Sequence, residues 1–596
     1  MKTSELRVDL AVKVARFRSN YVNFNTRSYN GHIPAPTIKV CPGDRLILTL
    51  TNLLEAGSNN NTNVHLHGMH LSPMGDADNV VPNVKPKGQR RYTYDIRRDH
   101  PAGTFWYHPH SHGNSNSQLN GMMAGALIVV DRPRDFPADL MAMEDLVLLL
   151  QALCIENCLN PRDNLQEAIE NKQSSHHRRL ESGAGVWNTD LRIVEDDADV
   201  PLNDTSLPTV FVNGQYLPTL QLSVGQYKRL RFVNAIANNV AELVTTYQSG
   251  CVFTVLAMDG IYYEQPKAKN VIVIPPGGRA DLSIVCSEMG TFYIETDCAS
   301  SRNSLLGLVN QHRVPSQRIV KLEVAHQEID DADVDFGSPF KYMRLPTTLP
   351  KRPAYMDDTI GTPASRPMIE KKNQHDFEFS VWMEENLMYG VNHKKLDMTQ
   401  TTYSMPVNEM QQWEISIKDY RKESIWNCNL IDNHTRVARQ LTAAHYCHTM
   451  SHPFHMHSTH FQVSDMDDTT DPDGILFDVG EWRDTLPLFR GGVQIRFTPR
   501  EYMVGNILAH CHFASHVDAG MAELINVYDS STRVNSASKA EEMASDVSGE
   551  EKRASDADEE DKESASDEEE EDDSAVDEDE EEASDDIGDV DVKLEK

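Results

Sequence analysis

Short runs in which hydrophobic and polar residues alternate recur along the first 530 residues. Examples are V-D-L-A-V-K-V-A-R-F at 8–17, T-I-K-V-C-P-G-D-R-L-I-L-T-L at 37–50 and R-L-R-F-V-N-A at 229–235. Side chains on a strand alternate between its two faces, so this period of two predicts β-strands. P-G-D at 42–44 and P-P-G-G at 275–278 are typical of turns between strands. Many short strands at close spacing, without a long amphipathic helix, predict an all-β fold of sandwiches or barrels.

Repetition and breaks in composition predict the domain organisation. Residues 34–51 and 218–234 share a proline, a strand, a glycine turn and a second strand, which is typical of repeated domains of one type. A chain of 596 residues is long enough for three domains. Boundaries are predicted near 131–140 and near 326–350, where Pro and Asp accumulate. The predicted segments are 1–135, 136–330 with a polar insertion at 156–200, 331–530, and a tail at 531–596.

The negative charge is concentrated in the tail. The whole chain has a net charge of −35, and residues 531–596 hold 29 Asp and Glu against 7 Lys and Arg, a net charge of −22. Because this segment has too few apolar residues to bury a core, we predict a disordered tail. The tail either serves only to solubilise the protein or recruits cations or a basic partner. Its S-D-E-E-E segment is a candidate site for phosphorylation by an acid-directed kinase. The remaining chain is also acidic, which argues against nucleic acid as a partner.

No membrane span and no signal peptide are visible in the sequence. The longest apolar stretch, at 146–155, is too short to cross a bilayer and contains Gln151. Residues 1–15 alternate as a strand does and have no apolar core of signal-peptide length. The nine cysteines do not decide the compartment, which stays open.

Four histidine-rich clusters hold the candidate chemistry. They are H-L-H-G at 65–68, W-Y-H-P-H-S-H-G at 106–113, H-P-F-H-M-H at 452–457 and H-C-H-F-A-S-H-V-D-A-G-M at 510–521. Residues two apart on a strand share a face, so each H-x-H pair can direct two imidazoles at one metal cluster. Cys511 lies between two such histidines and must point to the opposite face. One strand can therefore touch two metal centres, one on each side.

The ligand types favour copper. Two His, one Cys thiolate and a weak, distant Met describe a blue-copper electron-transfer site, and an all-imidazole cluster also suits copper. Zinc is the competing interpretation, but structural zinc sites rarely combine so many His with one Cys and a following Met. Three further histidines beside the motifs are interpreted as surface or satisfied core residues, namely His70, His112 and His460.

In content and order, the four clusters resemble the copper-binding signatures of three-domain multicopper oxidases, the family that includes laccases, bilirubin oxidases and copper-resistance oxidases. N-G-H-I-P-A-P-T-I at 30–38 and M-D-G at 258–260 extend the resemblance, which covers most of 25–530. The resemblance implies three cupredoxin-like Greek-key domains, of which the second binds no copper. It also implies four copper ions, one of type 1, one of type 2 and a type 3 pair.

The resemblance assigns a ligand to each position. The type 1 copper takes His452, Cys511, His516 and the axial Met521. The type 2 copper takes His65 and His455. The type 3 pair takes the six remaining histidines of the motifs, which are His67, His108, His110, His457, His510 and His512.

The resemblance also implies the reaction. A reducing substrate gives single electrons through the exposed edge of a type 1 ligand such as His516, and Cys511 relays them to its neighbours in the trinuclear cluster. Four electrons and four protons convert O2 into two waters, so a carboxylate should relay protons. Asp78, and with less support Asp76, lies where the family often places this acid. The equal alternative is a turn aspartate in G-D-A-D-N.

Several positions depart from the family pattern. Ser458 occupies a position after the third cluster where the family often has a glycine. Val517 occupies a position where several bacterial relatives have a glutamate that can relay protons, and the neighbouring Asp518 need not replace that glutamate. The third domain has no methionine-rich segment, which weakens a dedicated cuprous-oxidase role. Candidate disulfides are Cys154 with Cys158 and Cys428 with Cys447.

These observations favour an oxidase of phenols or similar aromatic reductants, with O2 and a small reducing substrate as partners, and we expect a monomer. One alternative is a metallo-oxidase of Fe(II) or Cu(I), which requires acidic residues near the type 1 site. Another is a copper-binding protein without turnover, against which the relay through Cys511 argues. The family is usually extracellular or periplasmic.

Overall fold

The computed structural model describes residues 4–57, 60–153, 192–193, 209–296, 317–326, 344–356, 367–420, 452–471, 474–489 and 491–531. The predicted disulfides, the predicted disordered tail and most of the predicted insertion lie outside these residues. Among the described helices, none has both the length and the apolar character needed to span a bilayer.

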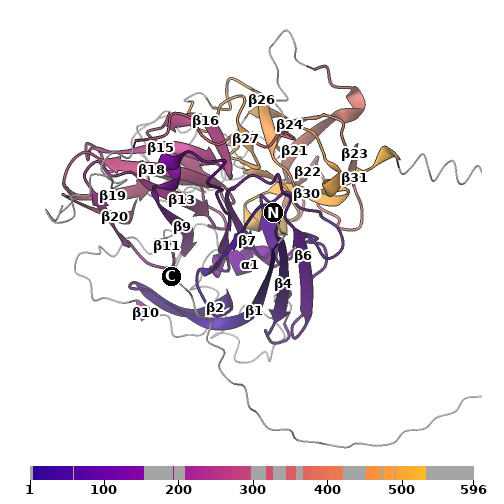
Figure 1. The fold of residues 1–596 in the computed structure, drawn as a ribbon. Coiled ribbons are helices and arrows are strands. Elements are labelled where there is room, and N and C mark those ends of the chain that lie inside the picture. Colours follow the sequence, from indigo (N-terminus) through magenta and orange to yellow (C-terminus); the bar gives the residue numbers. More distant parts are fainter. Residues whose placement is uncertain are drawn as a thin grey trace, which may run out of the picture. The chain divides into compact units, whose positions relative to one another are not determined.

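Strands dominate the described residues and form six sheets, which follow one another along the chain as three pairs, except that β10 of the first pair lies between β9 and β11 of the second (Figure 1). The first pair contains a five-stranded sheet, β10-β2-β1-β4-β6, and a four-stranded sheet, β3-β8-β7-β5. Its strands are β1 (Glu5–Arg18), β2 (Val22–Tyr29), β3 (Ala35–Val40), β4 (Arg45–Asn52), β5 (His65–His67), β6 (Gln89–Asp95), β7 (Gly103–His108), β8 (Gly125–Val129) and β10 (Arg192–Ile193). The helix α1 (Ser115–Asn120) lies between β7 and β8 in the chain.

The second pair of sheets follows the short helix α2 (Ala138–Met141). Its sheets have the orders β11-β9-β13-β18-β15-β16 and β12-β20-β19-β14-β17. The strands are β9 (Glu144–Leu153), β11 (Thr209–Val212), β12 (Thr219–Ser223), β13 (Lys228–Asn234), β14 (Ala241–Thr245), β15 (Cys251–Met258), β16 (Ile261–Ala268), β17 (Ile272–Ile274), β18 (Arg279–Cys286), β19 (Gly290–Thr296) and β20 (Gln317–Ala325). A disulfide between Cys251 and Cys286 joins the neighbouring strands β15 and β18.

The third pair of sheets has the orders β22-β21-β24-β29-β26-β27 and β23-β31-β30-β25-β28. The strands are β21 (Gln374–Met383), β22 (Leu387–Val391), β23 (Tyr403–Pro406), β24 (Gln411–Asp419), β25 (Phe454–Met456), β26 (Phe461–Met466), β27 (Trp482–Arg483), β28 (Thr485–Leu486), β29 (Gly492–Phe497), β30 (Gly505–Cys511) and β31 (Ala522–Tyr528). The short helices are η4 (Lys371–Asn373), η8 (Glu501–Met503) and α5 (Ala514–Asp518).

One strand-pairing pattern occurs in all three pairs of sheets. In one sheet of each pair, two strands run parallel: β1 with β4, β9 with β13, and β21 with β24. In the other sheet, an early strand runs parallel to a late one: β3 with β8, β12 with β20, and β23 with β31. The prediction of an all-β chain of repeated domains is therefore confirmed, whereas the boundaries at 135, 330 and 530 stay predictions.

The alternating runs of the sequence are strands in the structure. The run at 8–17 lies within β1, where Leu10 and Val12 are buried, and the run at 37–50 supplies β3 and β4. Between them, Gly43 has a φ of +96°, which glycine adopts without strain. The Asp44 carboxylate closes this turn by accepting a hydrogen bond from the Cys41 N–H at 2.8 Å. Alternation thus directs one face of each strand to a core.

A buried carboxylate joins the second and third pairs of sheets. Glu481 precedes β27, is 4 % exposed, and accepts hydrogen bonds from Tyr263 of β16 at 2.9 Å and Arg483 at 2.7 Å. Burial by itself raises the pKa of Glu481, but the charges of Arg483, Lys269 and Lys267 outweigh it and lower this pKa to about 2. Glu481 therefore stabilises the fold in its ionised form.

We expect Glu481→Gln to be less stable than the wild type at pH 7, because it leaves Arg483 buried without its charged partner. A pKa lowered from 4.5 to about 2 corresponds to about 3 kcal/mol of stabilisation. This contribution is complete above pH 4.5 and is lost as the pH falls towards 2. The difference in free energy of unfolding between the two proteins, measured from pH 7 to 3, should shrink in acid. A constant difference would contradict the assignment.

Candidate metal centres

The candidate ligands of the H-x-H motifs lie on, or within two residues of the ends of, two pairs of adjacent antiparallel strands. Pairing of β5 with β7 places His65 opposite His108, and pairing of β25 with β30 places His455 opposite His510. His67, the second histidine of H-L-H-G, lies in β5 with His65 and shares its side of the strand. The second histidines of the other three motifs follow within two residues of the end of their strand, and they are His110, His457 and His512. One strand pair belongs to the first pair of sheets and the other to the third.

Eight imidazoles meet where these strands face one another. The Nε2 atom of His510 lies 3.2 Å from Nε2 of His110 and 3.1 Å from Nε2 of His457. The Nε2 atom of His512 lies 3.2 Å from Nδ1 of His67. Three groups of ring nitrogens each lie within 4.8 Å of one another, and they are His65, His67 and His455; His67, His108 and His512; and His110, His457 and His510.

The unpaired ring nitrogens of this cluster fit a metal. Nε2 of His65, of His108 and of His455 is buried and has no hydrogen-bond partner among the described residues. A buried polar atom without a partner costs about 1–3 kcal/mol. Copper binds several neutral imidazoles at once and would satisfy these atoms together. The cluster therefore has the donor set that a group of copper ions requires.

Burial keeps these histidines in the form that binds metal. Exclusion from water lowers the pKa of His67 and of His108 far below its ordinary value, and the neighbouring imidazoles lower both further. Burial likewise lowers the pKa of His510, to about 4. These three rings are consequently neutral at pH 7, so metal binding to them requires no loss of a proton.

Hydrogen bonds behind the rings select the nitrogen that faces the cluster. Nδ1 of His65 lies 2.8 Å from Oδ2 of Asp78, and Nδ1 of His455 lies 2.8 Å from the backbone oxygen of Asp484. In both rings, Nε2 therefore remains available to bind a metal. In His67 the two ring nitrogens exchange these roles: Nε2 lies 3.3 Å from Oδ1 of Asp484, and Nδ1 faces the cluster. Contacts of this kind fix the tautomer and orientation of metal-binding histidines.

A second group lies on the other side of β30. Nδ1 of His452 and Nδ1 of His516 are 3.2 Å apart, and Sγ of Cys511 lies 3.6 and 3.5 Å from them, respectively. Burial raises the pKa of the Cys511 thiol, so the thiolate needs a bound cation to form here. The Cys511 N–H donates to the backbone oxygen of Met521 at 3.0 Å, and the Met521 side chain is fully buried in the same core. The donors fit a blue-copper site.

The two aspartates predicted near the first motif differ in environment. Asp78 is 2 % exposed, contacts His65, and accepts a hydrogen bond from the Leu66 N–H at 3.1 Å. Asp76 is exposed. Of the two, only Asp78 is therefore placed to act on the imidazole cluster.

The departures from the family pattern are accommodated locally. Ser458 has a φ of +65°, the left-handed conformation that a glycine would adopt without strain. Val517 is buried, and the Asp518 carboxylate accepts hydrogen bonds from the Gly113 N–H at 2.9 Å and the Asn116 N–H at 2.8 Å. Asp518 thus connects α5 with the segment that begins α1.

The structure adds two charged residues that the sequence did not reveal. Arg279 of β18 and Asp484 form a fully buried ion pair in which Nη1 donates to Oδ1 at 2.7 Å, and Asp484 also contacts His67. Arg279 and Asp484 are 205 residues apart, and Asp484 is 417 residues from His67, so no local pattern links them. In the sequence, Arg279 and Asp484 stand out only as charged residues beside apolar runs.

The additional histidines His70, His112 and His460 lie outside both groups of candidate ligands. Nε2 of His70 lies 2.7 Å from Nδ1 of His460, and Nε2 of His460 lies 3.2 Å from Oδ2 of Asp484. Both are buried with polar partners, as expected for satisfied core residues, whereas His112 is exposed.

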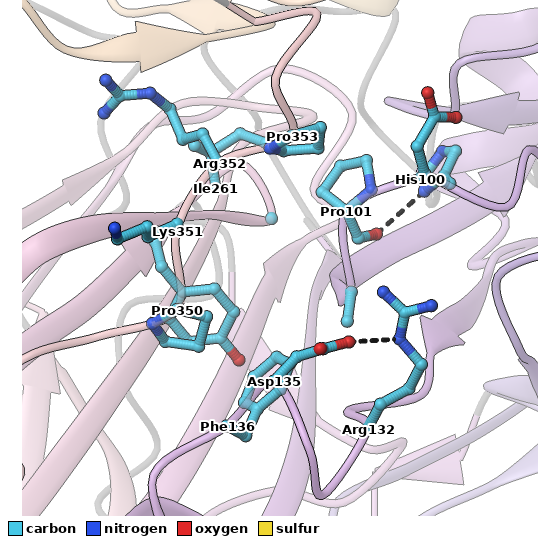
Figure 2. Close-up of a pocket in the computed structure, with 14 residues that line it drawn as sticks. His100, Pro101, Arg132, Asp135, Phe136, Ile261, Pro350, Lys351, Arg352 and Pro353 are labelled. Atoms are coloured by element: carbon cyan, nitrogen blue, oxygen red, sulfur yellow. Dashed lines mark hydrogen bonds and ion pairs between the residues drawn. The ribbon is translucent and has the colours of Figure 1, made fainter.

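A cavity of about 410 Å³ has none of the twelve candidate ligands in its lining. Figure 2 shows Arg132 paired with Asp135 at its wall, 2.7 Å apart, and the His100 ring directed at the Pro101 carbonyl. Lys351 and Arg352 line its opposite side. The cavity therefore offers no direct contact with either candidate centre.

Known proteins share both the sequence and the fold. Two sequence profiles described as "Multicopper oxidase" match residues 14–134 and 362–531. Multicopper oxidase mco of Staphylococcus aureus is 23% identical over 518 residues, which cover 86% of each chain. A metallo-oxidase of Campylobacter jejuni has the same fold, with a TM-score of 0.58 and 19% identity over 88% of this chain and 94% of the other. A laccase of Pediococcus acidilactici also has this fold, with a TM-score of 0.60 and 19% sequence identity. The match covers 89% of this chain and 91% of the laccase.

The repeated cupredoxin-like sheets, the two groups of ligands and these matches agree: the chain belongs to the multicopper oxidase family. Proteins of this family are copper-dependent oxidoreductases that use a reducing substrate and O2 as the electron acceptor.

We expect Cys511→Ser to fold and to bind copper in the imidazole cluster but to lack the intense blue absorption, which arises from charge transfer between thiolate and copper. Visible absorption and thermal unfolding of the copper-loaded variant test this. Cys41→Ser, which changes an exposed thiol, is the matched control and should stay blue. A blue Cys511→Ser protein would show that the sulfur is not a ligand.

Proposed function

We propose that the chain oxidises small phenolic or related aromatic reductants one electron at a time and reduces O2 to two waters. The observation that supports this most strongly is the position of Cys511. Its sulfur lies with His452 and His516, while its sequence neighbours His510 and His512 lie in the imidazole cluster. A protein that only stores copper has no need for a short covalent path between two sites.

We further propose four copper ions per chain, held by the twelve residues assigned above. Bound copper supplies the one-electron redox chemistry at both centres. The residues of the chain hold the neutral imidazoles in place, bury the thiol and keep water from the cluster. Each O2 requires four donor electrons and four protons.

Asp78 is the proposed proton-relay carboxylate. Its Oδ2 lies 2.8 Å from Nδ1 of His65, and its side chain is shielded from solvent by the fold. A carboxylate next to a reacting centre can relay protons to it by accepting and donating them in turn. Asp78 thus supports the protonation of O2, whereas the exposed Asp76 does not.

A metallo-oxidase is the second candidate function. Glu384 and Glu385 are exposed in the turn that links β21 to β22, and Tyr389 of β22 contacts His516. Acidic side chains near the type 1 ligands are what an Fe(II) or Cu(I) donor would need, and the Campylobacter jejuni protein is described as a metallo-oxidase. The apolar side chains Met383 and Leu387 at the same hairpin, both exposed, favour an organic donor instead.

Oxygen consumption by the copper-loaded chain with a neutral phenol, Fe(II) and Cu(I), tested side by side, distinguishes these functions. We expect sustained uptake with the phenol, four one-electron equivalents per O2, and no hydrogen peroxide. Cys511→Ser and the copper-free chain are the controls and should show none. Uptake with Fe(II) or Cu(I) alone would favour the metallo-oxidase, and no uptake with any donor would favour copper binding without turnover.

A further inference from the structure

One hairpin covers both histidines of the blue-copper group. Strands β21 and β22 pair antiparallel, with Val381 opposite Tyr389 and Met383 opposite Leu387. The Tyr389 ring stacks on the His516 ring, with centroids 4.4 Å apart and planes inclined by 20°. The Phe379 ring lies 5.2 Å from the His452 ring.

Exposure along this hairpin increases away from the ligands. Side chains two apart share a face, so Tyr389 and Leu387 share one face of β22, and Val381 and Met383 share one face of β21. Val381 is fully buried, Tyr389 is half-buried, Leu387 is 37% exposed and Met383 is 55% exposed. One face of the hairpin therefore carries both Tyr389, which contacts the ligand His516, and the exposed apolar side chains Leu387 and Met383.

His516 does not present the exposed edge that the resemblance implied. Its side chain is buried, with an exposure of 4%, and Tyr389 lies against its ring. The rings of Phe513 and His452 also contact the His516 ring, but both of these side chains are fully buried, whereas Tyr389 is half-buried. Of these three ring contacts, Tyr389 is therefore the one that a donor in solvent can touch.

We propose that Tyr389 is the residue through which electrons reach His516, and that a small aromatic donor packs on Tyr389 beside Met383 and Leu387. This inference rests on the proposed oxidation of aromatic reductants. The donor loses one electron, which crosses the two stacked rings to the centre held by His516, and the phenolic proton passes to water. Tyr389 undergoes no net oxidation. The oxidant is the oxidised centre that multicopper oxidase activity already supplies.

The chemistry of the hairpin favours an aromatic donor over a metal ion. Aromatic rings pack in offset-stacked or edge-to-face arrangements on other rings, and thioether and aliphatic groups also contact rings favourably. Glu384, the first acid of the turn, accepts a hydrogen bond from Trp382 Nε1 at 2.9 Å. Trp382 lies one residue from Val381 and so on the other face of β21. The Glu384 carboxylate is therefore held by a residue on the face of β21 opposite to the one that carries Val381 and Met383.

Anaerobic reduction of the blue absorption by a neutral phenol, followed by stopped flow, tests the proposal. We expect Tyr389→Leu to lower the second-order rate at least about tenfold, because ring contacts with both donor and imidazole are lost. Tyr389→Phe retains the ring and should recover most of that loss. The reduction potential of the centre, measured by titration, should be nearly the same in all three proteins.

The matched control is Tyr403→Leu. Tyr403 also stacks on a histidine of the third pair of sheets, with its ring 4.0 Å from that of His375, but neither residue is a candidate ligand. This variant should reduce at the wild-type rate. Equal rates for Tyr389→Leu and wild type, or equal losses in Tyr389→Leu and Tyr403→Leu, would overturn the proposal.

A measurement on the copper-free chain separates this inference from the proposed function. Diethyl pyrocarbonate modifies exposed imidazoles, and peptide mass analysis reports the extent at His516. Tyr389→Leu should increase this modification relative to wild type and Tyr403→Leu, and no increase would show that Tyr389 does not cover the ligand. If wild type fails to oxidise phenols but His516 becomes reactive, the proposed function and the aromatic donor are wrong, while the covering role of Tyr389 remains supported.

Discussion

The alternation of side chains along β30 is the constraint on which both centres depend. Because consecutive residues point to opposite faces, His510 enters the imidazole cluster while Cys511 enters the core of the third pair of sheets. Pairing with β25 places His455 opposite His510 and Phe454 opposite Cys511, so the same register fills both faces. A slip of one residue would exchange the faces and destroy both groups together. The short path between the centres is thus a consequence of strand geometry.

The imidazole cluster also depends on contacts between parts of the chain that are distant in sequence. The second pair of sheets provides none of the candidate ligands, yet it supplies Arg279, whose ion pair with Asp484 holds the carboxylate that faces His67. Removing one partner of such a buried pair costs about 3–5 kcal/mol, because the other charge stays buried. The second pair also supplies Gly277, where a side-chain Cβ would lie 2.7 Å from ring atoms of His512. The second pair of sheets therefore shapes the cluster, although it contains none of the candidate ligands.

The sequence predicted the features that depend on local periodicity. Strands, paired imidazoles and the opposite placement of Cys511 follow from a period of two, and the resemblance supplied the repeated cupredoxin-like fold. The sequence favoured Asp78 over Asp76 but could not distinguish a relay acid from a turn aspartate, because the difference lies in burial by distant residues. Nor could it place Tyr389 over His516, since an isolated tyrosine in a hairpin shows no sign of its partner across the sheet. Long-range contacts of this kind require the folded chain.

We propose that two groups of residues, linked through Cys511, hold four copper ions. Native mass spectrometry of the copper-saturated chain, together with elemental analysis, measures this directly. We expect four copper ions per chain, which are retained when an equal concentration of zinc is present. A chain that saturates with one or two copper ions, or that binds zinc in preference to copper, would contradict it.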